Sequence, residues 1–198
     1  MSCVFCKMDH TKVENTIIDE SNHFLVLPSV GSLVDGYLMI VSKRHINSMA
    51  ELKENEKMEY ELLIKKYRTL FKDIYHQYPI LFEHGSPIMD SNMKANSVVH
   101  AHTHIVNHHF IDEKNMIKKL NFNRIENLSY LSKEKNYIMY LNQENVCYLT
   151  NHFEPVRQMM RKIIAKDLGY ENKFDWQKEM FTENINSTIK NFKKGSDY

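Results

Sequence analysis

The chain has 198 residues and 26 basic against 25 acidic side chains, which give a formal net charge of +1. This balance gives no indication of general binding to nucleic acid or to a membrane surface. No apolar run in the sequence approaches the roughly 20 residues that span a bilayer, and the N-terminus shows no signal-peptide hydrophobic region.

We therefore expect a cytoplasmic protein, in which thiols stay reduced. Hydrophobic residues make up 42% of the chain, enough for one large domain or one domain with an extension. The three cysteines, Cys3, Cys6 and Cys147, are then expected to be thiols or metal ligands rather than disulfide partners.

The first motif is the pair Cys3 and Cys6, a C-x2-C spacing with which two thiolates bind one metal ion. A complete site needs two further ligands from elsewhere in the chain. Taken alone, the pair is weak evidence for a metal, and a coincidental pair of thiols explains it as well.

Two strands are predicted next, at residues 22–28 and 37–42, joined by a turn-rich connection at 30–36. The second is a nearly continuous apolar run, which is typical of a buried strand. His45 follows at its end, where functional side chains are often placed, although a lone histidine there is more often structural.

Ser48 and Glu51 match a capping box, and helical spacing predicts one long helix from there to about Tyr78. We expect this helix to be a scaffold packed across the sheet. Residues 79–85 predict a short strand in which Glu83 and His84 point to opposite faces.

The segment 86–96 has no regular pattern and leads directly into a row of histidines. With free backbone N–H groups, Asn92, Lys94 and Ser97 are candidates to bind phosphate oxygens. A solvated connection is the alternative.

His100, His102 and His104 alternate with apolar residues, so the pattern predicts a strand that carries all three on one face at intervals of roughly 6–7 Å. Imidazole is a nucleophile, a proton carrier and a metal ligand near neutral pH. The alternative is a histidine-rich surface strand or a small metal patch. His108 and His109 break the alternation and are interpreted as surface or edge residues.

The second half of the chain predicts further elements. Residues 112–130 are polar, and the composition of residues 137–141 and 146–150 predicts a pair of strands. Two helices follow, one starting at Pro155 and closed by Gly169 and one spanning 181–192. Cys147 falls inside a strand and is expected to be buried and inert. The simplest division places a catalytic domain at 1–110 and an extension at 111–198, packed on it as one unit.

The stretch from Ser97 to Val106 matches the His-x-His-x-His motif of the histidine triad (HIT) family, and residues 38–46 resemble that family's strand ending in a basic residue and histidine. The resemblance covers residues 3–106. It implies an α+β fold, a HIT-like antiparallel sheet with the long helix packed on it and a C-terminal α/β extension, and it implies a homodimer.

The resemblance to zinc-carrying members also implies a complete metal site made by Cys3, Cys6, His45 and His100. Two thiolates and two imidazoles suit zinc, and four protein ligands leave no position for water, so the ion would be structural.

In the family the middle histidine, here His102, attacks the α-phosphorus of a nucleotide. His104 would then hold or protonate phosphate or leaving-group oxygens, and Ser97 would donate a hydrogen bond. The implied substrates are nucleoside phosphoramidates, dinucleoside polyphosphates or adenylylated compounds. Two departures from the family stand out: the place of its acidic ribose-binding residue falls near Ser29, and Asn107 replaces a proline after the triad.

Two other functions stay open. One is a non-catalytic nucleotide-binding or protein-interaction module with a structural zinc, which has no need of a nucleophile at His102. The other is a redox or metal-transfer protein, which requires an accessible dithiol at Cys3 and Cys6 and is disfavoured if histidines complete the site.

Overall fold

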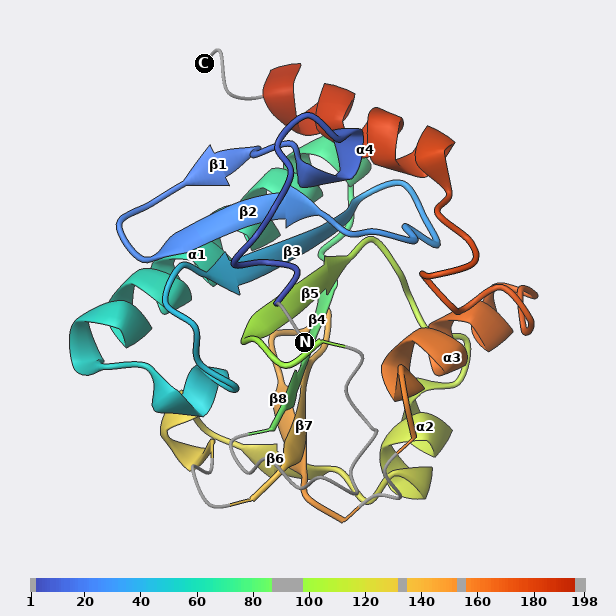
Figure 1. Ribbon diagram of the computed structural model, residues 1–198. Coiled ribbons are helices and arrows are strands. Elements are labelled where there is room, and N and C mark those ends of the chain that lie inside the picture. The colour runs from blue at the N-terminus through green and yellow to red at the C-terminus, as the bar shows by residue number, and fades with distance from the viewer. Residues whose placement is uncertain (1–2, 87–97, 132–134, 153–155, 195–198) are drawn as a thin grey trace.

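An eight-stranded sheet lies at the centre of the computed structural model, which describes residues 3–86, 98–131, 135–152 and 156–194 (Figure 1). Neighbouring strands are antiparallel and follow the order β1-β2-β3-β5-β4-β7-β8-β6. With helices packed on it, this sheet confirms the predicted α+β class. The strands are β1 (Asp19–Glu20), β2 (Phe24–Pro28), β3 (Tyr37–Ser42), β4 (Ile80–Gly85), β5 (His102–Val106), β6 (Asn123–Ile125), β7 (Tyr137–Leu141) and β8 (Cys147–Thr150).

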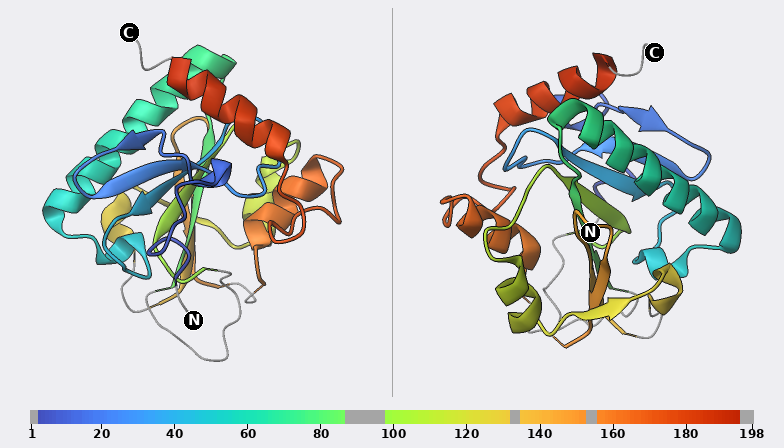
Figure 2. Two further views of the ribbon diagram at one scale, coloured as in Figure 1. Left: turned by 45° about the horizontal axis from the view of Figure 1, so that its top comes forward. Right: turned by 180° about the vertical axis from the view of Figure 1, so that it is seen from behind.

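Helices cover both faces of the sheet. The long helix α1 crosses one face (Figure 2, right), where Tyr67 and Phe71 are buried with Ile40 and Ile105 of the strands. On the other face, α2 and α3 contribute to a second apolar cluster. The helices are α1 (Glu54–Tyr75), α2 (Glu113–Lys119), α3 (Met159–Asp167) and α4 (Thr182–Lys194), and the 3-10 turns are η1 (Val13–Asn15), η2 (Met49–Glu51) and η3 (Leu128–Tyr130). Within the described residues, no helix has the length and apolar character needed to cross a membrane.

The long helix is shorter than the sequence predicts. Ser48 accepts a hydrogen bond from the backbone of η2, so it caps that short turn instead of α1. The start of α1 is stabilised by Glu56, whose carboxylate accepts a 2.7 Å hydrogen bond from the backbone N–H of Lys53. At the other end, His76 adopts a left-handed conformation with φ 59°, which ends the helix before the predicted limit at Tyr78.

Strands from the second half of the chain continue the sheet beyond β4. The pairing of β7 with β4 runs from Leu81 opposite Leu141 to Gly85 opposite Tyr137. The edge of β4 is therefore covered by the chain itself. The division into residues 1–110 and 111–198 stays a prediction, and the hydrogen-bonded sheet extends across it.

The C-terminal helix α4 returns to the connection between β2 and β3. The carboxylate of Asp35 accepts hydrogen bonds from the Ser187 hydroxyl at 2.7 Å and from the Asn191 amide at 3.1 Å. The backbone N–H of Gly36 donates to the Thr188 hydroxyl at 2.9 Å. These contacts hold the β2–β3 connection, which borders the cavity described below.

Other expectations meet mixed outcomes. The strand pair β7–β8 and the last helix are confirmed. The histidine strand was expected to carry His100, but it begins only at His102. Pro155, the expected start of a helix, lies outside the described residues. The interpretation of His108 as a surface residue is wrong, because its side chain is buried and its Nε2 lies 3.0 Å from a carboxylate oxygen of Asp167. Asp167 ends α3, so this contact ties the second half of the chain to the segment after β5.

Candidate active site

Strand β5 divides its side chains between the two faces of the sheet. Thr103 faces α1, and its hydroxyl oxygen lies 2.6 Å from the hydroxyl oxygen of Tyr60. The alternation of strand side chains then places His102 and His104 on the opposite face, where their ring centroids are 4.9 Å apart. The two histidines predicted to be catalytic are thus neighbours on the face away from α1.

Cys3, Cys6, His45 and His100 come together from three separate parts of the chain. Their potential ligand atoms all lie within 4.8 Å of one another. The Nδ1 atom of His100 is 3.3 Å from the sulfur of Cys3 and 3.6 Å from that of Cys6, and the Cys6 sulfur is 3.2 Å from Nδ1 of His45. The structure therefore assembles the four side chains that the sequence analysis selects for a metal.

The donor set fits zinc in both chemistry and spacing. Zn–S bonds of about 2.3 Å and Zn–N bonds of about 2.0 Å at tetrahedral angles separate sulfur from nitrogen by roughly 3.5 Å, near the distances found. The Nε2 atom of His100 lies 2.6 Å from the carbonyl oxygen of Ser42, so Nε2 carries the proton and Nδ1 presents its lone pair to the cysteines. Four protein ligands complete a tetrahedron, which is the pattern of a structural metal site.

The tautomer of His102 is set by its own backbone. Its Nδ1 lies 2.7 Å from the carbonyl oxygen of His100, and because a carbonyl only accepts, Nδ1 is the protonated nitrogen. The lone pair is therefore on Nε2. Burial lowers the pKa of His102 to about 4, so the ring is neutral near pH 7. Phe5 packs against both histidines, with ring centroids 5.4 Å from His100 and 5.3 Å from His102.

His104 is held by aromatic contacts. Its ring stacks on Phe82 with a centroid distance of 4.4 Å and an interplanar angle of 20°, and the ring of Tyr37 lies edge-on at 5.6 Å. Burial lowers the pKa of His104 well below its usual value, and the charge of Arg161 lowers it further. Within the described residues, its buried Nδ1 has no hydrogen-bond partner. His104 is thus a neutral, rigidly packed imidazole with a buried nitrogen that lacks a partner among the described residues.

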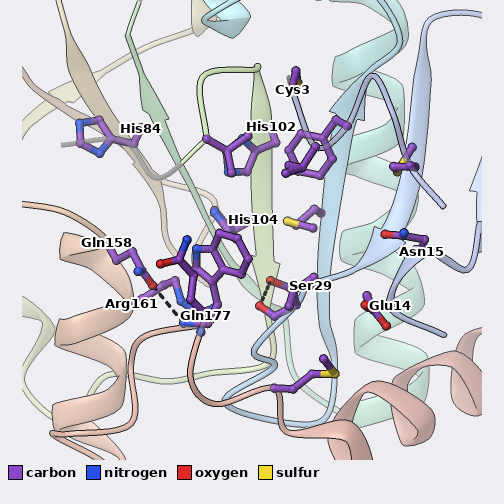
Figure 3. A pocket seen from close by; sticks show the side chains of 18 of the residues that line it. Cys3, Glu14, Asn15, Ser29, His84, His102, His104, Gln158, Arg161 and Gln177 are labelled. Atoms are coloured by element: carbon purple, nitrogen blue, oxygen red, sulfur yellow. Dashed lines mark hydrogen bonds between the residues drawn. The ribbon is translucent and has the colours of Figure 1, made fainter. Parts of the chain in front are cut away.

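A cavity of about 620 Å³ adjoins His102 and His104 (Figure 3). Its volume falls within the range of roughly 300–1,000 Å³ that is usual for small-molecule sites. The N-terminal segment contributes residues such as Phe5 and Glu14, and the C-terminal half contributes Arg161 and Trp176. The cavity is therefore built by both halves of the chain around the histidine strand.

Of the residues predicted to bind substrate, Ser29 lies in the described part of the chain. It lines the cavity, and its hydroxyl donates a 3.2 Å hydrogen bond to the carbonyl oxygen of Val30. Asn92, Lys94 and Ser97 lie outside the described residues. Their predicted contacts with phosphate stay predictions.

Several cavity residues were not selected from the sequence. His84 lies on β4 beside the histidine strand, and burial lowers its pKa to about 4. Its place on the face opposite Glu83 follows from strand alternation, so this signal was present in the sequence. Arg161 and Trp176 are different, because no motif or spacing connects either residue to the histidines.

No family model matches the chain. Curated relatives do match it. Protein hit of Bacillus subtilis is 23% identical over 107 residues, which are 53% of this chain and 70% of that protein. An uncharacterized HIT-like protein of Methanocaldococcus jannaschii is also 23% identical, over 105 residues, which are 52% of this chain and 77% of that protein.

Solved structures of low sequence identity are also similar to this chain. One is a Zn-bound histidine triad family protein from Mycobacterium smegmatis, with 17% sequence identity and a TM-score of 0.43. The match covers 57% of this chain and 78% of the Mycobacterium smegmatis chain.

Proposed function

We propose that this HIT-like protein is a nucleotide hydrolase or nucleotidyl transferase that reacts at the α-phosphorus through a nucleotidyl intermediate on His102. The hydrogen bond between Nδ1 of His102 and the carbonyl oxygen of His100 carries this proposal, because it leaves the lone pair on Nε2. The substrates are nucleoside phosphoramidates, dinucleoside polyphosphates or adenylylated compounds.

The reaction proceeds in two displacements. The Nε2 lone pair of His102 forms a bond to phosphorus while the bond from phosphorus to the leaving group breaks. The leaving group departs with that electron pair and takes a proton from water. A neutral imidazole approaches an anionic phosphate without charge repulsion. The ring becomes cationic in the intermediate, and the His100 carbonyl stabilises it through the Nδ1 proton. Water, or another acceptor in a transferase, then attacks phosphorus and releases its proton to solvent, and the electron pair of the P–N bond returns to Nε2.

Neighbouring residues bind and orient the substrate. We assign His104 to the phosphate or leaving-group oxygens, since its buried Nδ1 has no partner among the described residues. Ser97, Asn92 and Lys94 are assigned to phosphate oxygens, as the sequence predicts. Ser29 lines the cavity at the place assigned to the ribose.

A zinc ion bound by Cys3, Cys6, His45 and His100 would supply no reactive group, because all four of its positions are filled by protein. It would join the N-terminal segment to the end of β3 and to the residue that sets the tautomer of His102. The metal centre would therefore serve the reaction by positioning the nucleophile.

The homodimer expected from the resemblance is part of this proposal. Strand β4 is paired with β7 of the same chain, so two chains cannot associate by pairing their β4 strands. The dimer would form through another surface. Sedimentation at micromolar concentration tests this point, and a mass of one chain would contradict it.

Turnover tests the proposed function. The purified protein is incubated with diadenosine tetraphosphate, adenosine 5′-phosphoramidate and an adenylylated amine, and release of nucleoside monophosphate is followed by chromatography. We expect release by the wild-type chain and none by His102→Ala, which still binds nucleotide. Nucleotide binding without turnover of any compound in the wild-type chain would instead favour a non-catalytic binding module.

A further inference from the structure

Arg161 is a buried cation in the wall of the cavity. Its side chain is 4% exposed, and it lies on α3 in the half of the chain that follows the histidine strand. Its Nη2 donates a 2.6 Å hydrogen bond to the carbonyl oxygen of Gly31, and its Nε donates to that of Phe174 at 3.1 Å. Both acceptors are neutral backbone groups, so they orient the guanidinium without cancelling its charge.

The third nitrogen of the guanidinium, Nη1, differs from the other two. Within the described residues, Nη1 of Arg161 is buried without a hydrogen-bond partner, and no ion pair includes Arg161. Contact with the face of the Tyr37 ring, 5.4 Å from the guanidinium carbon, offsets only part of the lost hydration. A buried charge without a partner is strongly unfavourable, and an anionic ligand would remove this penalty.

The position of Arg161 separates it from the proposed nucleophile. Its charge lowers the pKa of His104, and Tyr37 contacts both His104 and Arg161. His102 lies on the other side of His104, toward the metal cluster. The carboxylate of Glu14 also lines the cavity but lies across it from Arg161 (Figure 3).

We propose that Arg161 binds a second phosphate group of the substrate, separate from the phosphate that reacts at His102. The guanidinium offers a fork of N–H donors that matches phosphate oxygens, and two of its nitrogens are already fixed in place. This inference rests on the proposed function for the nucleotide nature of the ligand. It assigns to the C-terminal half a direct contact with substrate.

The second phosphate has two chemical sources. It can belong to the leaving group, as in a phosphoanhydride, or it can be a phosphate ester on the ribose of the nucleotide. In both cases the ligand carries two phosphates, which distinguishes it from a simple nucleoside phosphoramidate.

Equilibrium binding tests the inference without turnover. Adenosine 5′-monophosphate, adenosine 5′-diphosphate and adenosine 3′,5′-bisphosphate are titrated calorimetrically into the full chain carrying His102→Ala. We expect one bisphosphorylated ligand to bind about 10- to 100-fold more tightly than the monophosphate, the range of a hydrogen-bonded charged contact. Preference for the diphosphate indicates the leaving-group source, and preference for the 3′,5′-bisphosphate indicates the ribose source.

The variant Arg161→Met should abolish this preference and leave the affinity for the monophosphate within about threefold. Arg157→Met is the matched control, because it removes an exposed charge from the segment just before α3 and should preserve the preference. Equal affinities for the three ligands in the parent protein would overturn the inference. A preference that survives Arg161→Met, or equal loss of all three ligands with a lower melting temperature, would also overturn it.

Two further results keep the test decisive. If Arg161→Met does not fold, Arg161→Lys replaces it, and this variant should keep part of the preference because it keeps the charge. The wild-type chain can also fail to turn over any substrate while the ligand preference still depends on Arg161. That result would contradict the proposed function and leave the second phosphate site intact.

Discussion

The Nδ1 atom of His102 donates a 2.7 Å hydrogen bond to the backbone carbonyl oxygen of His100. The ring of His100 presents its own Nδ1 to the sulfurs of Cys3 and Cys6. One residue therefore belongs to the cysteine–histidine cluster and sets the tautomer of the neighbouring histidine. Because a nucleophile tolerates little displacement, the proposed mechanism predicts that loss of the metal would lower reactivity.

The first prediction concerns the metal. The purified chain should contain one zinc ion, and Cys3→Ser or Cys6→Ser should remove it and lower the melting temperature, because metal binding energy is also folding energy. Elemental analysis and thermal melts measure the two effects. Cys147→Ser is the control, since Cys147 lies on β8 and its pKa is raised to about 11 by burial. A metal-free wild-type chain that melts like both variants would show that the site is assigned wrongly.

The cysteine pair and the histidine face could be predicted from the sequence because both follow from short-range patterns. A C-x2-C pair places two sulfurs together, and alternation places His102 and His104 on one face. The resemblance to known proteins then supplied His45 and His100 as the remaining ligands. In the structure all four lie within one cluster.

The rest of the site depends on packing between distant segments, which no local pattern reports. Arg161 reaches the cavity because it hydrogen-bonds the carbonyl oxygen of Gly31, 130 positions earlier in the chain. His108 is buried because α3 supplies Asp167 as its partner. The start of α1 also differs from the prediction, since Ser48 caps η2 and Glu56 accepts the hydrogen bond from Lys53 at the start of α1.

A second prediction ranks the substrate contacts of the proposed mechanism. His104→Ala should slow turnover less severely than His102→Ala, because it removes a hydrogen bond and not the nucleophile. Ser97→Ala should be milder again, since one hydrogen bond to a charged oxygen contributes about 1.5–3 kcal/mol. Values of kcat/KM for the three variants measure this order of severity. A lower kcat/KM for Ser97→Ala than for His102→Ala would contradict it.

A third prediction concerns the opposite face of the sheet and the pH dependence of stability. Glu83 is buried there and accepts hydrogen bonds from the Met49 backbone at 2.7 Å and from the Tyr137 hydroxyl at 2.8 Å. Burial raises the pKa of Glu83 to about 7. In the unfolded chain a glutamate has a pKa near 4.3, so the folded chain binds this proton more tightly. The contribution of Glu83 to stability is thus greatest below about pH 4, falls as the pH rises to about 7, and is constant above that.

Glu83→Gln should therefore gain stability relative to the wild-type chain as the pH rises from 5 to 8, by an amount on the order of 2–3 kcal/mol. Urea unfolding at the two pH values measures the difference. Glu61→Gln is the control, because Glu61 is exposed on α1. A wild-type-to-variant difference that does not change with pH would rule out this titration of Glu83.

The central claim is that His102 is the nucleophile, and a trapped intermediate tests it most directly. The wild-type chain is mixed with a labelled nucleotide substrate, quenched during turnover and digested, and the labelled peptide is identified by mass spectrometry. We predict an acid-labile, base-stable nucleotide adduct on His102, as expected of a phosphoramidate bond. His102→Ala should carry no adduct and should lose several powers of ten in rate. Full activity in His102→Ala, with the labelled adduct on another residue, would contradict the mechanism.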